Sequence, residues 1–361
     1  MGAGLLFNLQ VLRGLAALGV AFYHTDFRLA GDWHTDFSGV SIFFVISGFI
    51  MCFITRQDAD DFLTKRFVRI VPMYWLCTLA FIVFAYMSGR LSLSIWTTLA
   101  TDLPRSLLFL PSEKTPLLGV GWTLNFEIYF YLAFAVALWI NRHFAPLITA
   151  LFIYAVFALD QSGYGGFLTH YYSHDYIDYF LVGIALFYIW TFCSRFLRGW
   201  PITAICAAAI LYFYSSQFAR PLWPDWSLAY HWWFPPLIVA SALFMESSGT
   251  PITWRPAILL GDASYSLYLT HTIFYAVDRK LLQGWHLPTP KESIAVMLFE
   301  VVMATFIGIA IHLYVEKPLL RKVRLATGSS PKSSEQIVLE PSRNQEECAS
   351  NEAPTPATPL R

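Results

Sequence analysis

The chain has 361 residues, of which 56% are hydrophobic, 17% aromatic and only 13% charged. An ordinary soluble domain carries roughly 25% charged residues, so this composition excludes a normal soluble globular protein. The 24 basic and 24 acidic side chains give a formal net charge of zero, so no overall positive field exists to attract nucleic acid. The 5 cysteines show no metal-binding spacing, and we expect neither a metal site nor a disulfide framework.

Stretches of about 20 mostly apolar residues recur along the chain, and a helix of that length crosses the core of a bilayer. We therefore predict an all-α, polytopic membrane protein with about ten transmembrane helices. The predicted spans are residues 9–25, 39–55, 70–87, 121–140, 145–160, 176–192, 202–218, 233–246, 259–278 and 293–315. A further apolar stretch, residues 95–110, is interrupted by Thr101, Asp102 and Pro104, which favours an interfacial or re-entrant segment.

The loops between these spans differ in their number of basic residues, and this difference sets the orientation of a membrane protein. With the N-terminus inside, the inner loops hold 12 Lys and Arg residues and the outer loops hold 8, so both termini are predicted to be cytoplasmic. No cleavable signal pattern precedes the first span, which is therefore expected to remain. We expect residues 1–324 to form the membrane domain, and residues 325–361, which lack aromatic side chains, to be a disordered cytoplasmic tail.

The first span carries two ionisable residues, Arg13 and His24, and such residues are costly inside a membrane. At about 100° and 1.5 Å per residue, their spacing places both within about 20° of one helix face and about 16 Å apart along the axis. Gly14, Ala17 and Gly19 lie between them and would let a helix or a ligand approach closely. The alternative is structural: Arg13 extends to the inner interface and His24 caps the helix at the outer one.

Glu127 lies about two turns into the otherwise apolar fourth span, too deep to complement the helix dipole from its N-terminus. A carboxylate at that depth needs a partner, which Arg13, His24 or a water-filled cavity would provide. If that partner is His24, the carboxylate would favour the imidazolium or orient one tautomer, as in general-base histidines. The alternative is a structural pair that ties two helices together.

Two arginines precede the third predicted span. Arg66 and Arg69 are three residues apart, so in a helix they share one face and would form a cationic pair at the cytoplasmic surface. Guanidinium groups match phosphate oxygens two at a time, which suits a phosphate-bearing ligand. The alternative is the ordinary excess of positive charge inside the membrane, with contacts to anionic lipid.

The ninth predicted span combines several hydroxyl groups with an imidazole. Ser264, Tyr265 and His271 are candidates to contact the substrate or a developing oxyanion. The alternative for His271 is a buried histidine bonded to a backbone carbonyl. Glu300, in the last span, is a further membrane carboxylate. Neither Ser47 nor Ser264 lies in a GxSxG elbow, so a serine nucleophile is not supported.

Six segments in this order resemble the acyltransferase-3 family of integral membrane acyltransferases. They are Leu12–Ala17 with His24, Gly39–Phe49, Arg66–Pro72, Trp122–Leu124 with Glu127 and Tyr131, Ser264–His271, and Glu316–Pro318. Within the family, the beginning of the chain looks most like the exopolysaccharide O-acetyltransferases, such as those acting on succinoglycan. Gln10 departs from the acidic residue common in the wider family, so no aspartate role is carried over to that position.

The resemblance implies an O-acetyltransferase in the plasma (bacterial inner) membrane. It would transfer an acyl group, usually acetyl, from acyl-CoA at the cytoplasmic side to a sugar hydroxyl of a cell-surface polysaccharide or its lipid-linked precursor. The family's catalytic signature falls on Arg13 and His24, and its donor-binding element falls on Arg66 and Arg69. The implied partners are acetyl-CoA as donor substrate, the glycan or lipid-linked oligosaccharide, membrane lipid and polysaccharide-assembly proteins, with no metal and no nucleic acid.

In the expected mechanism, His24, oriented by Glu127, removes the proton from the sugar hydroxyl as its oxygen attacks the thioester carbonyl. A covalent acyl-histidine intermediate is the competing version. Arg13, with a hydroxyl from the ninth predicted span, would stabilise the developing oxyanion. The alternative of another class is a proton-coupled transporter or flippase of a lipid-linked glycan, in which His24, Glu127 and Glu300 relay protons.

Overall fold

The computed structural model describes residues 6–25, 39–89, 95–219, 227–285, 288 and 293–327. All regular structure in these residues is helical, without a strand, which confirms the all-α prediction. The helices are α1 (Phe7–Tyr23), α2 (Gly39–Thr55), α3 (Phe62–Met87), α4 (Ile95–Thr97), η1 (Thr98–Asp102), α5 (Leu103–Leu107), η2 (Gly119–Gly121), α6 (Trp122–Ile140), α7 (Ala145–Gln161), α8 (Phe167–Tyr172), α9 (Tyr176–Cys193), α10 (Trp200–Ala219), α11 (Ser227–Ser247), α12 (Arg255–Asp262), α13 (Ser264–Gly284), α14 (Ile294–Ile311), η5 (His312–Glu316) and α15 (Lys317–Thr327).

Every predicted span coincides with a described helix or a pair of helices. Among the described residues, four helical segments are long and apolar enough to cross a membrane: Phe62–Met87, Gly119–Ile140, Tyr176–Cys193 and Ile294–Thr327. Five shorter apolar helical stretches, each of 10–17 residues, lie in α1, α2, α7, α10 and α11. The chain is therefore a membrane protein. Of the predicted tail, residues 328–361 lie outside the described residues.

Three elements differ from the predicted spans. α11 begins at Ser227 rather than at residue 233. α3 begins at Phe62 rather than at residue 70, because the charged segment ahead of the apolar run is already helical. The ninth predicted span is two helices, α12 and α13, which meet at Ala263. The predicted non-spanning segment, residues 95–110, forms short helices that lie against α3, where Trp75 Nε1 donates a hydrogen bond to the carbonyl oxygen of Leu107 at 2.9 Å.

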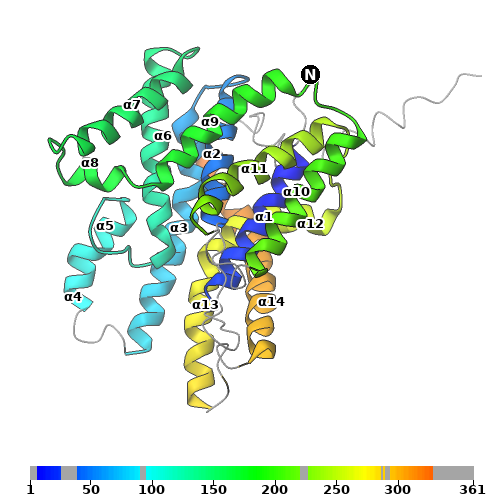
Figure 1. Cartoon of the computed structure of the whole chain (residues 1–361). Helices are drawn as coiled ribbons and strands as arrows, with labels where there is room; N and C mark the ends of the chain where they lie inside the picture. Colours follow the sequence, from blue (N-terminus) through cyan, green and yellow to red (C-terminus); the bar gives the residue numbers. More distant parts are fainter. Residues whose placement is uncertain are drawn as a thin grey trace, which may run out of the picture.

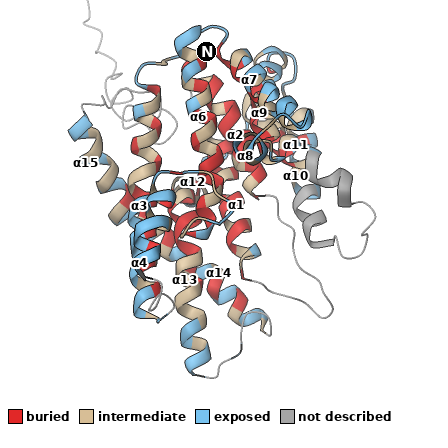
Figure 2. Cartoon of the chain, turned by 90° about the vertical axis from the view of Figure 1, so that its left-hand side faces the viewer, coloured by how far each residue is buried: buried red, intermediate tan, exposed pale blue. Residues whose placement is uncertain are grey.

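Helix α1 runs through the middle of the bundle and packs against α2, α11, α12 and α13 (Figure 1). Buried residues gather in α1, α2 and α6, whereas α15 lies at the edge without a buried residue (Figure 2). The start of α1 is tied to α11, because the carboxylate of Glu246 accepts hydrogen bonds from the backbone N–H groups of Phe7 and Asn8, at 2.6 Å and 3.2 Å.

Helices α2 and α9 cross closely at two glycines, Gly48 and Gly183. A Cβ atom at Gly48 would overlap the backbone carbonyl of Phe180, and one at Gly183 would overlap that of Val45. Neither neighbour is a flexible side-chain end, so only glycine lets the two backbones approach this closely. This crossing fixes the position of the middle of α2, which carries Ser47, along the axis of α9.

Candidate active site

A cavity of about 110 Å³ lies between α1, α2, α3, α6 and α13. One water molecule needs roughly 10–15 Å³ on this measure, so the cavity has room for several atoms of a ligand. Five of the eight predicted site residues line it: Arg13, Arg66, Arg69, Glu127 and Tyr265. Gln10, Ser47, Thr123, Tyr131 and Tyr268 complete the polar lining, and the remaining walls are apolar.

Glu127 is held in the cavity by two neutral donors. Ser47 Oγ, from α2, donates to Oε1 of Glu127 at 3.3 Å, and the hydroxyl of Tyr131, one turn further along α6, donates to the same oxygen. The guanidinium of Arg66 lies over the Tyr131 ring, with Cζ 5.9 Å from the ring centroid. Tyr131 therefore touches the carboxylate with its hydroxyl and a cation with its ring face.

Arg13 is linked to a carboxylate through Gln10. Nη1 of Arg13 donates to Oε1 of Gln10 at 3.2 Å, and Nε2 of Gln10 donates to Oδ1 of Asp262 at 2.6 Å. Helices α1 and α12 are pressed together here, because a Cβ atom at Gly261 would overlap the backbone carbonyl of Gln10. The end of α12 at Asp262 thus places a carboxylate beside the cavity.

Arg66 and Arg69 both line the cavity, as their spacing on one helix predicts. The predicted position at the cytoplasmic surface is wrong for Arg66, which is 2% exposed. The reason is the early start of α3 at Phe62, which carries both arginines into the bundle instead of leaving them ahead of it. A phosphate-bearing ligand would therefore meet them inside the protein.

His24 lies at the opposite end of α1. Its backbone is still helical, so α1 is continuous between Arg13 and His24, and about 16 Å separates them along the axis. His24 is not among the residues that line the cavity. Its Nδ1 lies 2.8 Å from the carbonyl oxygen of Val20 and 3.3 Å from Nε2 of His271. The backbone oxygen of His24 accepts a hydrogen bond from Arg279 Nη2 at 2.7 Å.

The prediction that Glu127 orients His24 is wrong. Both hydrogen bonds of Glu127 within the described part of the chain come from Ser47 and Tyr131, whereas the imidazole of His24 contacts His271. The length of α1 is the physical reason. A carboxylate at the level of Arg13 does not reach a ring that lies about three turns further along the same helix.

The other two candidates in the ninth predicted span lie at the start of α13. Tyr265 lines the cavity, and its hydroxyl donates to the backbone oxygen of Ile70 at 2.8 Å, which joins α13 to α3. Ser264 is fully buried, and its Oγ has no hydrogen-bond partner among the described residues. The structure thus brings Tyr265 to the cavity, Ser264 to the interior beside it and His271 to His24.

Two aromatic residues separate the cavity from the histidines. Phe43 and Tyr268 both line the cavity, with ring centroids 6.0 Å apart. The ring of Tyr268 is 6.1 Å from that of His271, and Phe43 also packs against the small core cluster around Ala21. The cavity and the histidine pair therefore adjoin across these two rings.

Four residues without an assigned role in the sequence complete the site: Gln10, Ser47, Tyr131 and Asp262. Asp262 carries the same signal as Glu127, because it is a carboxylate inside an apolar segment. Tyr131 follows Glu127 by four residues, a spacing at which helix side chains meet. Ser47 and Gln10 have no comparable signal, since uncharged polar residues are tolerated in membrane helices.

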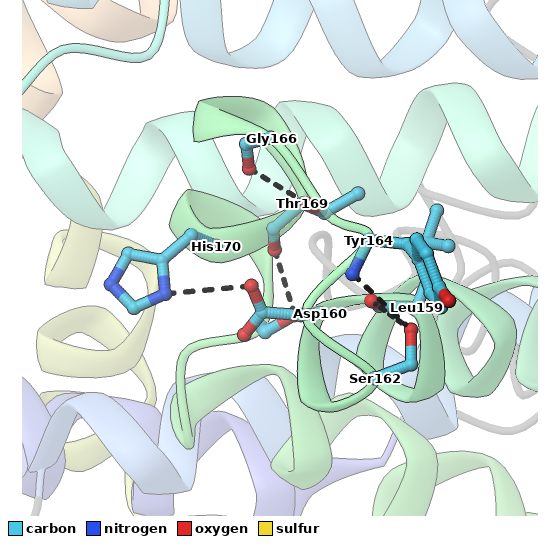
Figure 3. A network of polar contacts seen from close by, with 8 residues as sticks. Leu159, Asp160, Ser162, Tyr164, Gly166, Thr169 and His170 are labelled. Atoms are coloured by element: carbon cyan, nitrogen blue, oxygen red, sulfur yellow. Dashed lines mark hydrogen bonds and ion pairs between the residues drawn. The ribbon is translucent and has the colours of Figure 1, made fainter.

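A separate polar network connects the end of α7 to α8 (Figure 3). Asp160 Oδ1 lies 3.5 Å from His170 Nδ1, and Thr169 donates to the backbone oxygen of Gly166 at 2.7 Å. These residues do not line the cavity, and the His170 side chain is 84% exposed. The network stabilises the connection between α7 and α8 and is not part of the site. In the described ranges, no group of three His, Cys, Asp or Glu side chains could hold a metal ion.

Comparison with known proteins gives one family. A family model described as an acyltransferase domain, Acyl_transf_3, matches residues 6–314. The chain is 33% identical to the exopolysaccharide production protein ExoZ of Rhizobium meliloti (strain 1021), over 84% of this chain and 95% of that protein. No solved structure matches it.

Two further similar proteins are longer than this chain. They are the putative peptidoglycan O-acetyltransferase YrhL of Bacillus subtilis (strain 168) and the O-acetyltransferase OatA of Staphylococcus aureus (strain MRSA252), each 23% identical. The matches cover 86% and 91% of this chain. The chain spans 54% of the length of the first protein and 60% of the length of the second.

Proposed function

Since this chain belongs to the acyltransferase-3 family, we propose that it transfers an acetyl group from acetyl-CoA to a sugar hydroxyl of a cell-surface polysaccharide or its lipid-linked precursor. The names of the similar proteins support both halves of this proposal, because one refers to exopolysaccharide production and two to O-acetyl transfer. Family membership favours acyl transfer over the proton-coupled transporter or flippase, which no observation supports.

The observation that carries the proposal is the convergence of Arg13, Arg66 and Arg69 with Glu127 on one cavity. Three guanidinium groups thus line one cavity inside the protein. Guanidinium matches the oxygens of a phosphate group two at a time, so such a cavity suits a phosphate-bearing ligand. We therefore assign Arg66 and Arg69 to the phosphates of the acyl-CoA donor.

The two ends of α1 take different tasks in this proposal. Arg13 and Glu127 lie at the cavity, where the donor enters, and His24 lies where the acceptor hydroxyl arrives. The thioester has to extend past Phe43 and Tyr268 to reach His24. Because about 16 Å of helix separates Arg13 from His24, we assign Arg13 to holding the donor rather than to the oxyanion at the reacting carbonyl.

His24 is the proposed general base. Nε2 of His24 takes the proton of the sugar hydroxyl while the hydroxyl oxygen bonds to the thioester carbonyl carbon. The C–S bond then breaks, and the departing CoA sulfur receives the proton from the imidazolium. In the competing version, Nε2 itself bonds to the carbonyl carbon and the C–S bond breaks, which releases the CoA thiolate. The sugar oxygen then displaces neutral His24 from the acetyl group, and the hydroxyl proton passes to the CoA sulfur.

The remaining assignments concern the surroundings of the enzyme. We place it in the bacterial inner membrane with about ten crossings, both termini cytoplasmic and residues 1–324 as the acyltransferase domain. The acceptor is a glycan or a lipid-linked oligosaccharide. Polysaccharide-assembly proteins are the proposed partners that supply it.

The test is acetyl transfer from radiolabelled acetyl-CoA into surface polysaccharide, measured in inverted membrane vesicles at matched protein levels. We expect incorporation by the wild-type protein and loss of it in His24→Ala. His170→Ala is the matched control, because that histidine is exposed and lies outside the site. Normal incorporation by His24→Ala contradicts the role of His24. Incorporation from a longer acyl-CoA but not from acetyl-CoA contradicts the acetyl group.

A further inference from the structure

The imidazole rings of His24 and His271 meet at the end of α1 that is remote from the cavity. Nε2 of His271 lies 3.3 Å from Nδ1 of His24, and the ring centroids are 5.0 Å apart. His271 is completely buried, with the rings of Tyr268 and Tyr275 at 6.1 Å and 5.8 Å. The contact is therefore fixed inside the protein by packing on both sides of His271.

The neighbouring carbonyls identify the donor nitrogen of each ring, because a carbonyl oxygen only accepts hydrogen bonds. Nδ1 of His271 lies 3.0 Å from the backbone oxygen of Leu267, so Nδ1 carries the hydrogen and Nε2 of the neutral ring is an acceptor. Nδ1 of His24 lies 2.8 Å from the oxygen of Val20 and is also a donor. Its N–H therefore faces two acceptors, Val20 O and Nε2 of His271.

This arrangement determines which nitrogen of His24 can act as a base. A neutral imidazole has one N–H, so with Nδ1 protonated the lone pair of His24 is on Nε2. A protonated His271 does not fit, because its Nε2–H would face the Nδ1–H of His24. Two adjacent imidazolium rings would also repel each other strongly in a buried site. His271 is thus a neutral acceptor, also when His24 holds a second proton.

We propose that His271 is a positioning residue that holds His24 in the Nδ1–H form and stabilises the imidazolium formed when Nε2 takes the acceptor's proton. This inference rests on the proposed function, in which His24 is the base. His271 does here what a carboxylate does for the histidine of a Ser-His-Asp triad. It takes the orienting role that Glu127, at the other end of α1, does not fill.

The test uses the full-length protein in lipid nanodiscs and compares His271→Leu with His271→Gln. Leucine fills similar space without an acceptor, whereas glutamine places an amide oxygen near the position of Nε2. We expect His271→Leu to lower kcat for acetyl transfer about 10- to 100-fold, as loss of an orienting partner does. KM for acetyl-CoA stays unchanged, because the donor arginines lie at the cavity. His271→Gln recovers most of the rate.

A double variant separates positioning from a structural role. If His271 acts through His24, His271→Leu causes no further loss of the slow residual transfer that His24→Ala retains above a protein-free control. A further loss by the same factor as in the wild-type background overturns the proposal, and so does a wild-type rate in His271→Leu alone.

A second readout does not depend on activity. In protein labelled with ¹⁵N-histidine, the signals of His24 are those that vanish in His24→Ala. We expect Nδ1 of His24 to be protonated, its resonance to shift in His271→Leu and to return toward the wild-type position in His271→Gln. An unshifted resonance in His271→Leu overturns the proposal. Full transfer by His24→Ala would instead contradict His24 as the base, while the resonances still report whether His271 holds it.

Discussion

Arg13 and His24 lie on one stripe of α1 but belong to two different polar clusters. Arg13 lines the cavity and is linked through Gln10 to Asp262, whereas His24 contacts His271 beyond the cavity wall. The helix thus connects the cavity, where we place the donor, to the position where we place the base. Transfer requires the acyl group to cover the distance between them.

Phe43 lines the cavity and packs against the cluster around Ala21, so we propose that the acyl group passes it on the way to His24. Added bulk there should slow transfer without weakening donor binding. We expect Phe43→Trp to lower kcat about tenfold, equivalent to about 1.4 kcal/mol in the barrier. The Kd of labelled acetyl-CoA should not change, since Arg66 and Arg69 are untouched. The control is Phe152→Trp, which makes the same substitution at an exposed residue of α7. Undiminished transfer by Phe43→Trp would show that the acyl group takes another route.

Lysine cannot replace Arg66 or Arg69 if they bind phosphate, because it lacks the two-pronged guanidinium. We expect Arg66→Lys and Arg69→Lys each to raise KM for acetyl-CoA about tenfold, which is about 1.4 kcal/mol. Acetyl-pantetheine, which carries no phosphate, should be used equally well by the variants and the wild type. An equal loss with both donors would contradict phosphate binding. Arg142→Lys, at an arginine that is 55% exposed, serves as control.

Ser47 and Tyr131 should matter through Glu127. Each donates a hydrogen bond to the carboxylate, and bonds to charged groups contribute about 1.5–3 kcal/mol. We expect Ser47→Ala and Tyr131→Phe each to lower kcat/KM by roughly 10- to 150-fold, since about 1.4 kcal/mol corresponds to a factor of ten. In a Glu127→Gln background their effects should shrink, which kinetics of the double variants will measure. Full additivity would mean that they act independently of Glu127.

Gly183→Ala should destabilise the protein, because the added methyl group meets backbone and not a movable side chain. Overpacking of this kind costs about 1–3 kcal/mol. Thermal unfolding in detergent should show a lower Tm for Gly183→Ala and for Gly48→Ala. Gly284→Ala, where nothing lies within 4 Å, should leave Tm nearly unchanged. Equal Tm values for all three variants would contradict the close crossing of α2 and α9.

The loop between α2 and α3 carries an ion pair with a defined pH dependence. Lys65 Nζ donates to Asp58 at 2.8 Å and, with the backbone N–H of Asp60, lowers the pKa of the Asp58 carboxyl. Because the pKa is lower in the folded state, the pair stabilises the protein above about pH 4. That stabilisation is lost as the pH falls through the folded-state pKa, and at this partly exposed site it is at most about 1 kcal/mol.

The measurement for this pair is the Tm of the wild type and Asp58→Asn across the acidic range. We expect a small deficit in Asp58→Asn at pH 7 that disappears once the pH has fallen below the lowered folded-state pKa of Asp58, where both proteins carry a neutral side chain at this position. A deficit that persists at low pH would show that the asparagine disturbs the loop itself.

Apolar patterning predicted the helices well, and α2 has the bounds expected from its sequence, Gly39 to Thr55. It failed where charged residues are buried in protein rather than exposed to lipid. Hydropathy reads Lys65 to Arg69 as a loop, although Arg66 lies inside the bundle at the cavity. Hydropathy also predicts α12 and α13 as one span, because the apolar character of the sequence does not change at Ala263, where one helix ends and the other begins.

Five of the residues singled out in the sequence line the cavity, but the contacts between the candidate residues were not predictable. Arg13, His24, Glu127 and the two cavity arginines all stand out as charges in apolar surroundings. Which of them meet depends on how helices distant in sequence are placed against each other in height. The sequence contains no local sign that Glu127 lies level with Arg13 and His271 with His24.

Both ends of α1 are fastened to other helices, at Phe7 by Glu246 and at His24 by Arg279. The stretch between Arg13 and His24 therefore acts as a spacer. Its length sets the distance between the two residues, and its number of residues sets the direction in which His24 points around the helix axis. One inserted residue would lengthen it by about 1.5 Å and rotate everything beyond it by about 100°. His24 would then face away from His271 although every side chain is retained. In this stretch of α1, an insertion or deletion should therefore disturb the contact of His24 with His271 more than a substitution between Arg13 and His24 does.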